Sequence, residues 1–181
     1  NRIKVFDSSG AYLRSFGGYG NSCNRWSYAR QFTIYNDEIY IADTYNYRVK
    51  KLNLNGGCIA NIYLGTHKGA PHAIAVSANF WAVGFTNGAI YLYNRSSFYS
   101  RLRDYGFNTN YLHYSWGMSF NNAGNKLLVA DYYKNRLIEL NVSSGAKLSH
   151  SQVSSGTSMY GTGSYSTSNG LLRILLPKNL P

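Results

Sequence analysis

One phrase occurs twice in this chain, and its pattern constrains the fold more than any other feature. Residues 38–54 read EIYIADTYNYRVKKLNL, which is an apolar strand, an aspartate in a polar turn, and a second strand that opens with arginine. Residues 126–140 repeat this order as KLLVADYYKNRLIEL, and a weaker copy, WAVGFTNGAIYLY, lies between them at residues 81–93. Short apolar runs joined by Asn, Asp and Gly predict antiparallel strands with tight turns.

The copies recur at a nearly constant spacing. The residues that open the second strand of successive copies are Arg2, Arg48, Ala89 and Arg136, so the intervals are 46, 41 and 47 residues. A period in this range, with several short strands per unit, is the sequence signature of propeller blades. The expected units of a single domain are 18–64, 65–105, 106–150, and a fourth made of 151–181 together with 1–17.

The fourth unit is expected to be split between the two ends of the chain. Residues 1–17 carry two strand patterns that match the outer half of a unit, and residues 163–176 carry two that match the inner half. We therefore predict an all-β fold, a β-propeller of four four-stranded blades whose last blade joins N-terminal and C-terminal strands. Two alternatives stay open: an excerpt from a longer array, and a fibre whose neighbours complete each other's split blade.

The repeated residues resemble the NHL repeat. Its phrase is close to P-x-G-I-A-V, then a strand ending V-A-D, then N-x-R-I. The matching segments are 71–76 (PHAIAV), 41–43 (IAD), 129–131 (VAD), 46–49 (NYRV), 135–137 (NRL) and 1–3 (NRI). The resemblance implies an NHL propeller, from which Gly84 and Ala89 depart, and the family usually has more than four units.

The charge balance constrains the partners. Eighteen Lys and Arg residues against seven Asp and Glu give a formal net charge of +11. Such a surface favours polyanions such as RNA or acidic glycans. No apolar run approaches the roughly 18 residues that a membrane span needs, so we expect no span.

A candidate ligand site follows from the repeat. Loops on a propeller converge where the innermost strands open onto the central channel. The residues that precede the inner strand of each unit are Arg30, His72, Trp116 and Thr162. With the nearby tyrosines 28, 111, 114 and 160, this set could stack bases or sugar rings while positive charge holds phosphates or carboxylates. The alternative is that the tyrosines mainly pack blade against blade.

The same residues bear on catalysis. The NHL family includes a zinc-dependent amidating lyase whose metal is held by histidines from several blades, and His72 resembles one such ligand. A zinc site needs at least three ligands, whereas the other units offer Arg, Trp and Thr. Asp43 and Asp131 occupy the same turn of separate units, where an aspartate usually holds backbone amides. We expect no catalytic residue, no metal and no cofactor.

Three further features concern the compartment. Asn94 and Asn141 each begin an Asn-x-Ser glycosylation pattern. Cys23 and Cys58 are placed by the strand pattern toward opposite faces, and whether they form a disulfide stays open. The sequons, the Tyr, Asn, Ser and Gly content and a split blade that could link subunits favour an extracellular or cell-surface protein, with a cytoplasmic one as the alternative.

The expected function is therefore a non-catalytic binding or assembly module within a larger or filamentous structure. Its partners would be another protein, or copies of itself bound through the propeller faces or the split blade. The first alternative is an RNA-binding NHL domain that uses Arg30, His72 and Trp116. The second is a degenerate amidating-lyase-like enzyme.

Overall fold

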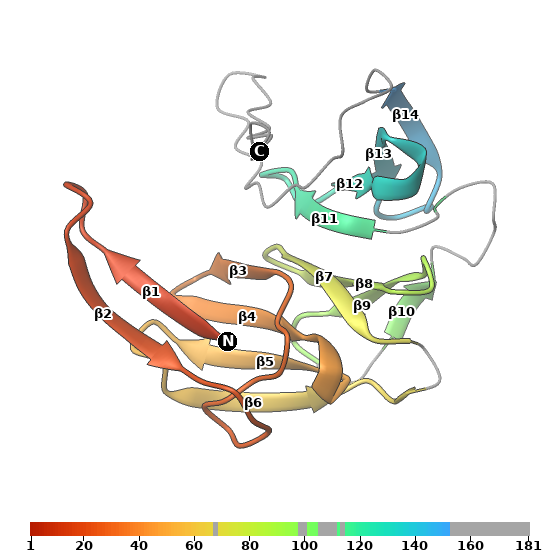
Figure 1. Cartoon of the computed structure of the whole chain (residues 1–181). Helices are drawn as coiled ribbons and strands as arrows, with labels where there is room; N and C mark the ends of the chain where they lie inside the picture. Colours follow the sequence, from red (N-terminus) through yellow and green to blue (C-terminus); the bar gives the residue numbers. More distant parts are fainter. Residues whose placement is uncertain (67–68, 98–100, 105–111, 113–114, 153–181) are drawn as a thin grey trace.

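The computed structural model describes residues 1–66, 69–97, 101–104, 112 and 115–152 (Figure 1). In these residues three four-stranded antiparallel sheets follow one another along the chain, preceded by a two-stranded hairpin. The hairpin is β1 (Arg2–Phe6) and β2 (Tyr12–Gly17), and the first sheet is β3 (Phe32–Tyr35), β4 (Glu38–Asp43), β5 (Arg48–Asn53) and β6 (Cys58–Tyr63). The second sheet is β7 (Pro71–Val76), β8 (Phe80–Phe85), β9 (Ile90–Asn94) and β10 (Arg101–Asp104). The third is β11 (Ser115–Phe120), β12 (Lys126–Asp131), β13 (Arg136–Asn141) and β14 (Lys147–Gln152).

Within each four-stranded sheet the strands pair in chain order, so every sheet is a meander. The first sheet contacts the second through β3, β4 and β7, and the second contacts the third through β7, β8 and β11. The first strands of the three sheets are therefore the inner ones, and the last strands lie at the outside. The predicted all-β fold is confirmed for the described residues. Residues 163–176, which the predicted fourth blade requires, lie outside them.

Apolar side chains fill the two spaces between the sheets. Tyr40, Val49 and Ile62 of the first sheet face Trp81 and Val83 of the second. A second cluster joins the other face of the second sheet to the third sheet. Both faces of the second sheet are thus covered, which explains why β7 and β8 are almost continuously apolar.

The hairpin covers only part of the remaining face of the first sheet. Ile3 and Phe16 pack against Ile39 and Ile41, which point away from the second sheet. Phe32 and Ile34 of β3 pair with these two isoleucines, so they lie on the same face, yet they remain 50% and 54% exposed. Along its other edge β1 pairs with no strand of the described part of the chain.

The expectation that Gly84 stands in the place of the repeat aspartate is wrong: Gly84 pairs with Ile90 as Ala130 pairs with Leu137, and Phe85 pairs with Pro71 as Asp131 pairs with Ser115. Phe85 therefore holds the aspartate position, and Gly84 is a glycine for a packing reason. A Cβ placed on it would collide with the Oγ of Ser115, because β11 approaches β8 closely there. Asp43 accepts a hydrogen bond from a backbone N–H of the segment that leads into its sheet, and in the second sheet Thr86 has this role. Its Oγ1 accepts a hydrogen bond from Ala70 N–H at 3.1 Å and so holds the segment that leads into β7.

Candidate ligand-binding site

Three of the four predicted ligand residues lie together at one end of the inner strands, and we call Arg30, His72 and Trp116 the mouth site. The guanidinium carbon of Arg30 lies 5.8 Å from the centroid of the Trp116 ring. The centroids of the His72 and Trp116 rings are 4.7 Å apart, in an edge-to-face arrangement. Thr162 and the tyrosines 111, 114 and 160 lie outside the described residues.

Two β-bulges position the aromatic members of the mouth site. The pairing of β7 with β8 shifts between Pro71 and Ala73, so that His72 is the additional residue. The pairing of β11 with β12 shifts in the same way around Trp116. A bulge redirects the side chain of its additional residue. The sequence does not predict these bulges, because they are visible only in the structure, as a one-residue shift in the pairing of the strands.

The charge of the mouth site comes from Arg30. His72 is only 1% exposed. Burial, together with the nearby charge of Arg30, lowers the pKa of His72 to about 4, although a backbone hydrogen bond at Ser115 acts in the opposite direction. His72 is therefore neutral at pH 7, and the site presents one exposed cation next to flat aromatic surface. This combination suits an anionic group carried on a ring.

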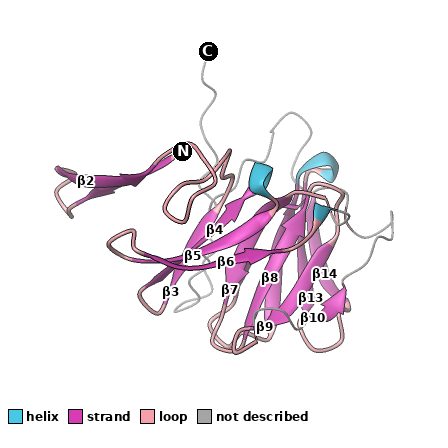
Figure 2. Ribbon diagram, turned by 90° about the horizontal axis from the view of Figure 1, so that it is seen from below, coloured by secondary structure: helices cyan, strands magenta, loops and turns pink. Residues whose placement is uncertain are grey.

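Tyrosines extend the mouth site across the same end of the sheets. The Trp116 ring lies 5.0 Å from Tyr132, which lies 5.2 Å from Tyr133. Tyr28 and Tyr45 form a second pair with centroids 4.5 Å apart. Tyr45 belongs to the 3-10 helix η1 (Thr44–Asn46), and Tyr132 and Tyr133 belong to η3 (Tyr132–Lys134). Figure 2 shows these short helices at the same end of the sheets.

Not all tyrosines belong to this surface. Tyr40 and Tyr93 are buried between the first and second sheets, as the packing alternative predicted, whereas Tyr28, Tyr45 and Tyr133 are exposed. The tyrosines therefore divide between core and surface, and Tyr28, Tyr45 and Tyr133 expose ring surface at the mouth end.

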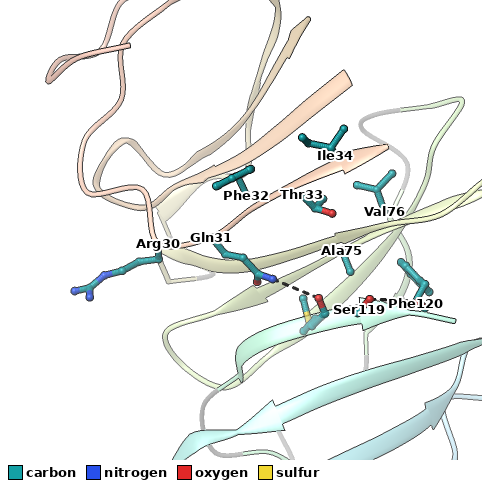
Figure 3. A pocket seen from close by; sticks show the side chains of 10 residues that line it. Arg30, Gln31, Phe32, Thr33, Ile34, Ala75, Val76, Ser119 and Phe120 are labelled. Atoms are coloured by element: carbon teal, nitrogen blue, oxygen red, sulfur yellow. Dashed lines mark hydrogen bonds between the residues drawn. The ribbon is translucent and has the colours of Figure 1, made fainter. Parts of the chain in front are cut away.

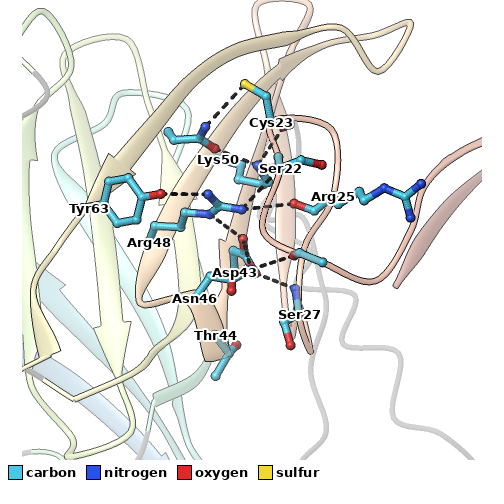
Figure 4. Close-up of polar contacts among 12 residues, drawn as sticks. Ser22, Cys23, Arg25, Ser27, Asp43, Thr44, Asn46, Arg48, Lys50 and Tyr63 are labelled. Carbon is cyan, nitrogen blue, oxygen red and sulfur yellow. Dashed lines mark hydrogen bonds and ion pairs between the residues drawn. The ribbon is translucent and has the colours of Figure 1, made fainter.

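The repeated aspartates brace turns, as predicted, and are not a carboxylate pair. Asp43 accepts hydrogen bonds from Ser27 N–H at 2.7 Å, from the Asn46 amide at 2.9 Å and from Arg48 Nε at 2.7 Å (Figure 4). Asp131 pairs with Arg136 Nε at 3.0 Å. Both aspartates are buried, and each sits where the chain turns from one strand into the next.

A buried lysine that the sequence did not reveal holds the loop between β2 and β3. Lys50 Nζ donates to the carbonyl oxygens of Ser22 at 3.1 Å and Cys23 at 2.7 Å, and to Asn61 Oδ1 at 2.7 Å (Figure 4). Burial and then the charge of Arg48 lower the pKa of Lys50 to about 8, while Asp43 acts in the opposite direction. The alternation of a strand that starts Arg48-Val49-Lys50 would normally place both cations in solvent. The loop that folds over them explains their burial.

Cys23 and Cys58 form a disulfide with their Cα atoms 5.6 Å apart. The expectation that they lie toward opposite faces is wrong. The loop that carries Cys23 folds back over the outer strands of the first sheet, which strand alternation alone does not reveal. The disulfide joins this loop to the start of β6.

The two glycosylation patterns have a structural role in the turns. Asn94 Oδ1 accepts from the backbone and hydroxyl of Ser96, and Asn141 Oδ1 accepts from those of Ser143. Asp7 makes the same pair of bonds with Ser9 in the hairpin, where no sequon exists. Asn53 does the same in the first sheet, where its Oδ1 accepts from Asn55 N–H and Gly57 N–H, so the Asn-x-Ser pattern of the other two sheets is explained by turn geometry. Use of the sequons as acceptors stays a prediction.

The inner strands enclose a hollow of about 390 Å³ below the mouth site (Figure 3). At its rim the buried amide of Gln31 joins all three sheets. Its Nε2 donates to Met118 O at 3.3 Å, and its Oε1 accepts from Ile74 N–H at 3.0 Å. The corresponding residues of the other sheets are Ala73 and Gly117, which have no side-chain amide. The repeat therefore does not predict this bond.

The described residues contain neither a cluster of metal-binding side chains nor a helix suited to crossing a membrane. No group of three or more His, Cys, Asp or Glu residues that could hold a metal ion occurs there. Within the same residues, none of the helices has the length and apolar character required to cross a bilayer.

No family model and no curated protein matches the chain. Among solved structures, Kuenenia stuttgartiensis hydrazine synthase is similar with a TM-score of 0.55 and 12% identity over 76% of this chain. The RRP9 WD40 repeats are similar with a TM-score of 0.56 and 14% identity over 69% of this chain. The matches cover only 40% and 38% of those two chains. These likenesses show a propeller-like all-β fold built from consecutive antiparallel sheets.

Proposed function

We propose that this protein is a non-catalytic NHL-type binding module whose ligand face is the mouth end of the propeller. The observation that carries the proposal is the contact among Arg30, His72 and Trp116, which come from three successive sheets. A cation beside aromatic rings binds anionic, ring-containing ligands, and such groups do not by themselves perform acid–base chemistry. His72 is neutral and buried, and Asp43 and Asp131 are engaged with arginines.

The experiment that tests this function is a binding assay with Arg30→Ala and Trp116→Phe. The probes are a uronate hexasaccharide and a single-stranded oligoribonucleotide, titrated by isothermal calorimetry. Arg30→Ala is expected to weaken binding about tenfold, because it removes the exposed cation of the site. Trp116→Phe keeps a ring and should lose less. Lys147→Ala, which removes a positive charge from exposed β14, is the control. Equal affinities of wild type and Arg30→Ala for every probe would remove the proposal.

The ring that presents this face is proposed to have four blades, closed by the N- and C-terminal halves of the split blade. Gln31 supports a narrow ring, since one side chain reaches both the neighbouring sheet and the next one. The exposed Phe32 and Ile34 support closure, because the proposed inner strands would lie beside β1 and cover them. Residues 163–176 supply two strand patterns of the inner type. A second copy of the chain supplying these strands would make the same contacts and give the assembly role.

An extracellular or cell-surface location belongs to the same proposal. The disulfide between Cys23 and Cys58 supports it, because disulfides persist mainly in oxidising compartments. Thiol labelling of the protein from its native source, without reductant, tests the location. Two labelled cysteines in freshly lysed cells would favour the cytoplasm instead.

RNA binding is the second candidate. The neighbouring Tyr28 and Tyr45 rings, which are tilted by 32° to each other, favour it, because exposed aromatic rings bind single-stranded bases with little sequence preference. The affinity of an RNA ligand should fall steeply with salt. It should also fall in Tyr45→Ala, whereas a sugar acid held mainly by Arg30 should be less sensitive to this change.

A further inference from the structure

A second cationic site lies at the rim of the same end, where the hairpin meets the loop after β2. Asn1, Arg2, Gly17, Gly18, Tyr19 and Arg25 line this hollow of about 580 Å³, which we call the rim pocket. It adjoins a groove between β1 and β3 that Asn1 and Arg2 also line and that reaches Arg30 of the mouth site. The inner strands proposed for residues 163–176 would fill this groove beside β1, so the path from the rim pocket to the mouth site runs over Asn1 and Tyr28, which are joined by a hydrogen bond of 2.7 Å from Tyr28 N–H to Asn1 Oδ1.

In the part of the chain that the structure describes, neither arginine of the rim pocket pairs with a carboxylate. Arg2 occupies the repeat position of Arg48 and Arg136, each of which pairs with an aspartate. Among the described residues Arg2 makes no ion pair and is exposed. Residues 151–181, which hold the other half of its expected unit, contain no Asp or Glu. Of these three equivalent arginines, Arg2 is thus the one that pairs with no aspartate in the described residues.

The Arg25 side chain lies against the backbone of Gly18 and Gly20, which adopts a conformation that favours glycine. Its Nη1 donates to the carbonyl oxygen of Tyr19 at 3.4 Å, which leaves its other N–H groups for a ligand. A Cβ on Gly18 would lie 3.2 Å from this same nitrogen, and the φ angles of Gly18 and Gly20 are +153° and +144°. A side chain at either position would be strained and, at Gly18, would crowd the guanidinium.

The first sheet holds the backbone of this loop in place. Asn46 donates to Gly20 O at 2.9 Å, and Arg48 Nη2 donates to Arg25 O at 3.2 Å. Lys50 holds the carbonyl oxygens of Ser22 and Cys23, and the disulfide fixes Cys23 to β6. A loop fixed by buried cations and a covalent bond needs little reordering when it binds a ligand, which favours affinity.

We propose that the rim pocket binds a sulfate or carboxylate group of an acidic polysaccharide whose chain continues toward Arg30. Arginine suits both groups, because its planar fork donates two parallel hydrogen bonds to an oxyanion. Exposed Tyr19 offers a ring face for a neighbouring sugar. Among the described residues no acidic one lines the rim pocket, so a polyanion meets no repulsion from them there. The proposal rests on the proposed mouth-site function for the inner end of the ligand.

The test compares Arg2→Ala, Arg25→Ala and Arg30→Ala in the full-length protein by calorimetry with a heparin-derived hexasaccharide and a hexagalacturonate. Each substitution at Arg2 or Arg25 is expected to weaken binding of at least one probe about tenfold. Arg14→Ala is the matched control, since Arg14 lies on the same hairpin and its Nη2 donates to Leu54 O at the opposite end. Far-ultraviolet circular dichroism shows that the variants are folded.

Each outcome decides between the two sites. Loss with Arg2→Ala or Arg25→Ala but not with Arg14→Ala supports the rim pocket, and the probe that is more affected identifies sulfate or carboxylate. Loss with Arg30→Ala alone overturns the rim pocket and leaves the mouth site. Absence of binding by wild type overturns both. Tighter binding of an oligoribonucleotide through Arg2 and Arg25 overturns the polysaccharide class.

Discussion

Arg48 Nε donates to Asp43 Oδ2 at 2.7 Å, with 1% of the arginine side chain and none of the aspartate side chain exposed. The guanidinium also donates to Tyr63 Oη and to the carbonyl oxygen of Arg25, so one residue joins a strand end, an outer strand and a loop. The Arg136–Asp131 pair repeats the bond in the third sheet with a partly exposed arginine. The repeated sequence segment thus contains an aspartate and an arginine that form the same ion pair in the first and third sheets.

Replacing Arg48 should destabilise the protein more than replacing Arg136. Arg48→Met leaves the buried Asp43 without its cation, which we expect to cost about 3 to 5 kcal/mol. Arg136→Met should cost less, because water reaches that pair more easily. Urea unfolding followed by circular dichroism measures both. Equal losses, or a larger loss for Arg136→Met, would contradict the assignment of Arg48 as the central brace.

The stability of the protein should depend on the protonation of His72. Its pKa is about 4 when folded and near 6.5 when unfolded, so between these values the unfolded chain binds more protons. The His72 contribution is therefore fully present above pH 6.5 and is lost as the pH falls toward 4. Unfolding free energies of wild type and His72→Gln, measured from pH 4 to 7.5, should differ less at the acid end. A constant difference would show that His72 titrates normally.

Gly84 should tolerate no side chain while Ser115 remains. Gly84→Ala places a methyl group against the Ser115 side chain and should cost about 1 to 3 kcal/mol through overpacking. Adding Ser115→Gly removes the opposing atoms and should recover part of this loss. A double-mutant cycle from urea unfolding gives the coupling between the two sites. Strict additivity would mean that β8 and β11 are farther apart than described.

The split blade should protect Phe32 and Ile34. If the proposed inner strands cover them, Phe32→Ala in the full chain should cost about 3 to 5 kcal/mol, as for a core phenylalanine. The same substitution after deletion of residues 163–181 should cost far less. Sedimentation velocity at two concentrations distinguishes closure within one chain from closure between copies. A small cost in both backgrounds would show that this face stays open to water.

Much of the architecture could be predicted because strand and turn signals are local. The repeat predicted the three four-stranded sheets of the described residues, and the equivalent positions Arg30, His72 and Trp116 meet because successive inner strands lie side by side. The function of these residues stays a proposal. Conversely, the sequence carried no signal for features that depend on contacts between distant segments. The bond of Gln31 to two other sheets and the burial of Lys50 under a loop are of this kind.

The disulfide is a further contact between distant segments that could not be predicted from the sequence. Cys23 sits in a loop, and strand alternation says nothing about where a loop folds. The bulges at His72 and Trp116 were missed for a different reason. A bulge changes the register by one residue, which lies within the uncertainty of any strand boundary read from a sequence.

The most direct measurement of the central claim is a map of backbone amide chemical shifts during titration with the hexasaccharide that binds more tightly. We expect the largest changes around Arg30, His72 and Trp116 and smaller ones around Tyr28 and Tyr45. No change is expected at the turns of the opposite end, marked by Asn53, Asn94 and Asn141. Chemical-shift changes concentrated at those turns, without changes at Arg30, His72 and Trp116, would contradict the proposed mouth site.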